Sequence, residues 1–120
     1  MHPAISEVIQ RCDRAQKITL AEIDELAASM SLTREQFYEA VLMAVAELFL
    51  RGALAFEVAD AIANEFWGLS EFSLSGRARE VFLAFDEGEY DHGRDSVGSD
   101  PVQLYTRPQI AAILRGKSVT

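Results

Sequence analysis

The sequence is short of the residues on which many catalytic and metal sites depend, with one cysteine and two histidines among 120 residues. Cys12 alone cannot form an intrachain disulfide or a cysteine-based zinc site. Residues 1–4 lack the charged and apolar regions of a signal peptide. These features lead us to expect a cytoplasmic protein.

Basic residues are scarce as well. Eleven Lys and Arg stand against nineteen Asp and Glu, which gives a formal net charge of -8. Such a charge opposes broad contact with nucleic acid or anionic lipid and favours a basic partner. The apolar run at 40–50 is too short for a membrane span and is interrupted by Glu47. We therefore expect a protein partner and no membrane partner.

Strand-like alternation is also missing, whereas helical periodicity runs through most of the chain. Thr19 with Glu22, and Thr33 with Gln36, form two capping boxes that mark helix starts. The helix at about 34–51 is apolar around most of its circumference, which is typical of a central helix. The sequence predicts an all-α fold: one helical domain over residues 1–120, a bundle of five main helices plus a short helix near Pro101.

Glycines and turn residues set the other expected boundaries. We predict helices at 3–16, from about 20, at 34–51, at 54–67 with Gly68 as the stop, and from Ser73 or Ser75 to Gly88. Two further helix-start signals lie at 100–103 and 106–109. The predicted core comprises Val41, Leu42, Val45, Leu48, Ile62, Phe66, Phe82 and Phe85.

The segment 88–100 has no apolar periodicity and forms an expected acidic loop. Six acids lie between Asp86 and Asp100, against Arg94 alone. Closely spaced carboxylates suit Ca²⁺ or Mg²⁺, but no frame of the segment fits the EF-hand pattern. We therefore predict a solvated loop and no cofactor, although the sequence leaves metal binding by the loop open.

Catalytic motifs are equally hard to find. Cys12 falls on an apolar helical stripe, where a cysteine is usually a small packed hydrophobe. The seven glycines do not cluster into a phosphate-binding loop. Neither histidine, His2 or His92, has a readable catalytic partner. The expected protein is not an enzyme.

Aromatic side chains outside the expected core are the better interface candidates. Trp67 lies one residue off the buried stripe of its helix, and Tyr90 lies in polar sequence. The polar stripe of Glu57, Asp60 and Asn64 is either a solvated face or part of one surface with the acidic loop. The predicted partner-binding residues are Asp86, Glu87, Glu89, Tyr90, Asp91, Asp95 and Trp67.

An alternative interpretation is a helix-turn-helix DNA-binding regulator over segment 20–45. Arg34, Gln36 and Tyr38 would then face the major groove, and Gln36 could pair with adenine. The phosphate contacts would come from Arg11, Arg14 and Lys17. Glu35 and Glu39 on the same recognition helix oppose this interpretation, because they would face the phosphate backbone. It therefore ranks second.

One part of the chain resembles a group of known proteins. It comprises residues 81–90, Asp100 and Pro101, and residues 105–110. This part of the chain resembles small uncharacterised bacterial proteins of the kind suspected to be toxin-immunity proteins. The resemblance implies a small acidic helical domain without catalytic apparatus that masks a basic active site, and it carries over no site residues.

Together these inferences predict a non-catalytic protein-binding domain, an immunity protein or inhibitor that neutralises a basic partner. Composition suits a phage-encoded inhibitor or an adaptor equally well. The sequence leaves open whether the chain forms a homo-oligomer.

Overall fold

The computed structural model describes residues 1–89 and 100–116, which form helices joined by loops. Its α-helices are α1 (Pro3–Asp13), α2 (Leu20–Ser29), α3 (Arg34–Leu50), α4 (Phe56–Leu69), α5 (Gly76–Gly88) and α6 (Arg107–Leu114). A π-helical turn, η1 (Val102–Thr106), leads directly into α6 and takes the place of the predicted short helix near Pro101. These residues contain no strand, which confirms the all-α prediction for the described part of the chain.

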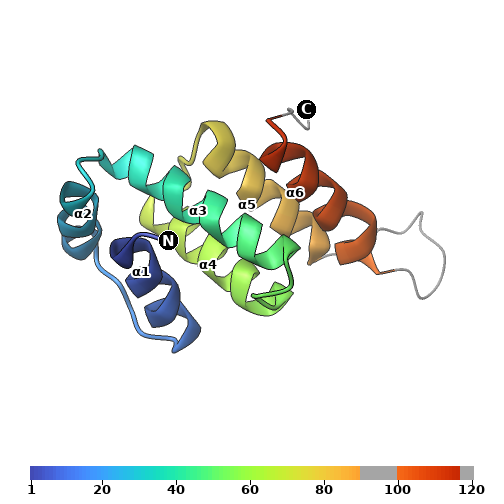
Figure 1. The fold of residues 1–120 in the computed structure, drawn as a ribbon, viewed down its shortest axis with the longest axis horizontal. Coiled ribbons are helices and arrows are strands. Elements are labelled where there is room, and N and C mark those ends of the chain that lie inside the picture. The colour runs from blue at the N-terminus through green and yellow to red at the C-terminus, as the bar shows by residue number, and fades with distance from the viewer. Residues whose placement is uncertain (90–99, 117–120) are drawn as a thin grey trace.

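Helix α3 lies at the centre of the fold (Figure 1) and contacts each of the other α-helices described. Helices α4 and α5 pack beside it, α6 lies toward one end, and α1 and α2 lie toward the other. The buried residues of α3 are Phe37, Tyr38, Val41, Leu42, Val45, Ala46 and Phe49. Every predicted core residue is buried except Leu48, which is half-buried because it lies at the edge of this face.

Both predicted capping boxes are present. Thr19 Oγ1 accepts from the Glu22 amide at 3.2 Å, and Glu22 Oε1 accepts from the Thr19 amide at 3.1 Å. Thr33 and Gln36 exchange the same pair of bonds at 3.2 and 2.9 Å. Glu22 also forms an ion pair with Arg11 of α1, and that guanidinium lowers the pKa of the carboxyl to about 2. The first box therefore ties α1 to α2 as well as starting α2.

Two helices, α1 and α4, differ from the prediction in their bounds. Helix α1 ends at Asp13 instead of residue 16, because Ala15 adopts a left-handed conformation with φ +55°. Helix α4 covers Phe56–Leu69 instead of 54–67, and Gly68, which we expected to stop it, lies inside it. The end of α4 is set instead by left-handed residues after the Ser70 cap, at Glu71 and Phe72. None of the helices described is both long and apolar enough to traverse a bilayer.

Gly88, the last residue of α5, is held in a close helix contact. A Cβ on Gly88 would approach the ring of Phe56 to 2.9 Å and would collide with Thr106 Oγ1. Thr106 is fully buried, and its hydroxyl donates to the Ala84 carbonyl at 2.7 Å. The absence of a side chain at position 88 therefore lets η1 pack against the last turn of α5, where the acidic segment begins.

The substitution Gly88→Ala should lower the free energy of unfolding by about 1–3 kcal/mol, because the added methyl group overpacks this contact. Gly68→Ala is the matched control: no atom lies within 4 Å of its Cβ position. At that helix-interior site alanine should stabilise by about 0.5–1 kcal/mol. Urea denaturation of both variants measures the difference, and equal effects at the two positions would contradict the packing described here.

Candidate functional site

Helices α4 and α5 run antiparallel and meet at the surface along a line of polar and aromatic side chains. On α4 the residues are Asp60, Asn64 and Trp67, spaced by four and three positions, and therefore on one helix face. The matching residues have the same spacing, and they are Phe82 and Asp86 of α5 and Glu89, the C-cap of that helix. We call these six residues, together with Phe72 at the aromatic end, the α4–α5 seam.

The aromatic end of the seam is a cluster of three rings, of which two are stacked. Trp67 lies flat on Phe82, with ring centroids 4.4 Å apart and planes at 11°. The ring of Phe72 packs on the same indole at 5.6 Å. Phe82 is nearly buried and Trp67 half-buried, but Phe72 is 67% exposed. An aromatic cluster with this much open surface has the composition of an interface anchor.

The backbone beneath this cluster is strained. Glu71 and Phe72 are consecutive non-glycine residues with φ of +55° and +64°. A left-handed conformation costs an L-residue about 1–2 kcal/mol, more than at a glycine. The same two residues close the end of α4, since their amides donate to the Gly68 and Trp67 carbonyls at 3.0 and 2.8 Å, and Phe72 lies exposed next to Trp67.

The opposite end of the seam gathers carboxylates from both helices. Burial, contact with Glu89 and the nearby charge of Asp86 together raise the pKa of the Asp60 carboxyl to about 7. Asn64 lies between the helices, and its Nδ2 donates to the Asp60 carbonyl at 2.9 Å and reaches Glu89 Oε2 at 3.5 Å. The acidic end is therefore a set of mutually repelling groups that a cation would relieve.

Three of the predicted partner-binding residues, Trp67, Asp86 and Glu89, lie on this seam. Glu87 does not: one position further round α5, its Oε2 accepts from Gln109 Nε2 of α6 at 2.7 Å. The remaining three predictions, Tyr90, Asp91 and Asp95, fall outside the described residues, as does most of the acidic loop at 88–100. The polar stripe of Asp60 and Asn64 joins the start of the acidic segment in one surface.

The residues that would read DNA bases in the helix-turn-helix alternative form contacts with other residues of this chain. Arg34 makes a bidentate ion pair with Asp24 of α2, at 2.9 and 2.8 Å. Gln36 accepts from the Thr33 amide in the capping box, and Tyr38 is only 4% exposed. The two helices and the turn are thus stabilised by the side chains that would have to read the bases.

Within residues 1–89 and 100–116, Cys12 is half-buried and His2 caps a helix. Burial raises the pKa of the Cys12 thiol to about 11, so it is not a thiolate at neutral pH. His2 is the N-cap of α1, where its Nδ1 accepts from the Ala4 amide at 3.0 Å. No cluster of three metal-ligating side chains occurs in these two ranges.

Comparisons of this chain with protein-family models, with curated proteins and with solved structures found no match.

The raised pKa of Asp60 predicts a pH dependence of stability. In the unfolded chain this carboxyl ionises near its ordinary value of 3.8, but in the folded protein it keeps its proton up to about pH 7. The native state therefore loses stability as the pH rises between these values. Asp60→Asn should flatten this loss and stabilise the protein at pH 8 by about 1 kcal/mol, less than the full shift implies because water screens a partly exposed group.

Asp24→Asn is the matched control of opposite sign. The ion pair with Arg34 lowers the pKa of Asp24. Its stabilising effect is therefore present above the unfolded value of 3.8 and is lost as the pH falls below it. Asp24→Asn should destabilise the protein at neutral pH, and this effect should disappear in acid. Urea denaturation from pH 3 to 8 would contradict the account if Asp60→Asn destabilised the protein at pH 8.

Proposed function

We propose that this chain is a non-catalytic protein-binding domain that docks a basic partner on the α4–α5 seam. The observation that carries the proposal is Phe72, an aromatic side chain held 67% exposed by left-handed backbone next to Trp67. Left-handed backbone at two consecutive non-glycine residues costs stability, and such conformations are enriched at functional sites. An exposed aromatic ring beside a line of carboxylates suits a protein surface with apolar and basic groups.

The two ends of the seam would contribute differently to binding. Asp86 and Glu89 supply negative potential, which speeds the encounter with a cationic partner and makes the rate dependent on salt. Trp67 and Phe72 supply apolar area that is desolvated only in the complex, so they would set the dissociation rate. The net charge of -8 extends the same preference for a basic partner over the whole chain.

The class of partner follows from the resemblance to suspected toxin-immunity proteins, which supports a role as an inhibitor that masks a basic active site. A carboxylate-rich seam with an aromatic anchor is suited to covering such a site by charge complementarity. A cytoplasmic location is part of this proposal, and the single cysteine of the chain supports it.

The experiment that tests the proposal begins with capture on the tagged full chain, from the organism that encodes it, and identification of the partner by mass spectrometry. Phe72→Gly should then weaken the affinity for the purified partner at least tenfold, mainly through faster dissociation. The same substitution should leave the stability of the free protein within about 1 kcal/mol, because the relief of left-handed strain offsets the lost packing of the ring on Trp67.

Ser31→Gly provides the matched control, because Ser31 is also left-handed, with φ +58°, but lies in the α2–α3 turn. It should stabilise the protein without changing the affinity. Neutralising the seam with Asp86→Asn and Glu89→Gln should slow association and reduce its salt dependence. If the partner binds Phe72→Gly and the neutralised variant as tightly as it binds the natural chain, the seam is not its docking surface.

The DNA-binding alternative makes a separate prediction. Because Arg34 and Gln36 hold partners within the protein, an electrophoretic shift against a library of genomic fragments should show no sequence-dependent binding at physiological salt. Sub-micromolar binding that is lost on Gln36→Ala would instead favour a transcriptional regulator. Thr33→Ala controls for loss of the capping box, since it breaks the same box without removing a base-reading group.

A further inference from the structure

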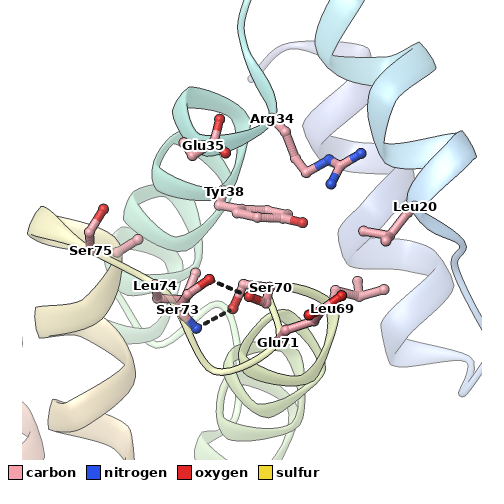
Figure 2. A pocket seen from close by; sticks show the side chains of 11 residues that line it. Leu20, Arg34, Glu35, Tyr38, Leu69, Ser70, Glu71, Ser73, Leu74 and Ser75 are labelled. Carbon is pink, nitrogen blue, oxygen red and sulfur yellow. Dashed lines mark hydrogen bonds between the residues drawn. The ribbon is translucent and has the colours of Figure 1, made fainter.

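A pocket of about 370 Å³ lies between the start of α3 and the loop that joins α4 to α5 (Figure 2). Leu20, at the first position of α2, also lines the pocket. Leu69 and Leu74 add apolar wall from either end of the loop. A pocket of this size accepts a small organic molecule or one long side chain.

Tyr38 supplies an unusual polar group to this lining. Its side chain is 4% exposed, and its hydroxyl oxygen is buried without a hydrogen-bond partner. Figure 2 shows the ring reaching from α3 across the view, with the hydroxyl lying among Arg34, Leu20 and Ser70. A buried hydroxyl without a partner is costly, so a native protein that keeps one invites a functional explanation.

Three of the other polar side chains around the pocket, Arg34, Ser70 and Ser73, already form hydrogen bonds. The Nε and Nη2 atoms of Arg34 are bound by Asp24. Ser70 donates to the Trp67 carbonyl at 3.0 Å, and Ser73 donates to the Ser70 carbonyl, which closes the turn of the loop. The hydroxyls of this turn therefore shape the pocket more than they bind within it.

Charge decides which class of ligand the pocket favours. The positive charge of Arg34 is balanced by Asp24, whereas Glu35 and Glu71 also line the pocket, and both are exposed. The lining with Asp24 therefore carries an excess of two negative charges, which opposes an anion and favours a cation. A tyrosine hydroxyl accepts as well as donates, so Tyr38 can take a hydrogen bond from an ammonium or guanidinium group.

We propose that this pocket binds an organic cation, a primary ammonium or guanidinium on a short aliphatic stem. The stem packs on Leu20, Leu69 and Leu74, and the cationic head donates to the Tyr38 hydroxyl with Glu71 at the rim. Because the hydroxyl oxygen is closed to bulk water, a lining side chain turns aside as the ligand enters. The proposed ligand contacts Leu20, Tyr38, Leu69, Glu71 and Leu74, none of which belongs to the α4–α5 seam.

The test is a titration of the full ¹⁵N-labelled chain with n-butylammonium chloride. The readout is the chemical shift of each backbone amide in NMR spectra. We expect saturable shifts at residues 34–38 and 69–75. Tyr38→Phe removes only an unpaired hydroxyl and should fold. We expect it to raise the dissociation constant for butylammonium at least fivefold. Glu71→Gln should raise it too, whereas Glu25→Gln, the same charge change on an exposed residue of α2 outside the pocket, should not.

Sodium butyrate has the same stem with an anionic head and should give no saturable shifts in these residues. The proposal is overturned if Tyr38→Phe titrates like the natural chain, if butyrate shifts the same amides, or if butylammonium shifts none of them. Each of these results leaves the docking of a basic partner on the seam untouched, because the titration contains no partner.

A second titration distinguishes the two sources of such a cation. A lysine side chain of a partner protein would bring main chain on both sides, as in acetyl-Gly-Lys-Gly-amide. If the natural occupant is a partner's side chain, this peptide should bind at least as tightly as butylammonium. If it is a free amine, the peptide should bind at least tenfold more weakly, because a pocket of about 370 Å³ that fits a small molecule lacks room for the flanking main chain.

Discussion

Helix α3 carries apolar side chains around most of its circumference, so it is stable only where other helices cover it on nearly every side. Its seven buried residues include Val41, Leu42 and Val45, all without exposed surface. That requirement places the other α-helices of the described chain around it and leaves each with one inner and one outer face. The positions of the polar groups follow from this arrangement.

Helices α4 and α5 show how covering α3 creates a surface. On α4 the inner stripe includes Ile62 and Phe66, and the neighbouring stripe of Asp60, Asn64 and Trp67 falls at the edge against α5. Carboxylates of the two helices meet there, and burial, together with the contact with Glu89 and the charge of Asp86, raises the pKa of Asp60 to about 7. The repulsion destabilises the free protein, and a cationic partner would relieve it.

Local signals in the sequence were enough to predict the fold class and several helix starts. Capping boxes depend on residues three positions apart, so Thr19 and Thr33 could be assigned without tertiary information. Helix ends were less predictable, because Gly68 is also compatible with a helix interior and the left-handed residues Glu71 and Phe72 have no sequence signature. The π-helical turn at η1 depends on packing against Gly88, which no local pattern reveals.

The site was predictable only in part, for the same reason. Helical spacing suggested that Asp60 and Asn64 could share a surface with the acidic segment, and the seam brings them to Glu89. Glu87 could not be separated from its neighbours by composition, since its different role depends on α6 supplying Gln109. The unpaired hydroxyl of Tyr38 could not be seen at all, because only the assembled fold shows which buried groups lack partners.

Amide hydrogen exchange of the chain with and without its captured partner tests the central claim most directly. The account predicts new protection along the seam, in peptides covering residues 60–72 and 82–89, with little change along the buried residues of α3. Protection confined to α1, α2 and the start of α3, with residues 60–72 exchanging as in the free protein, would contradict it.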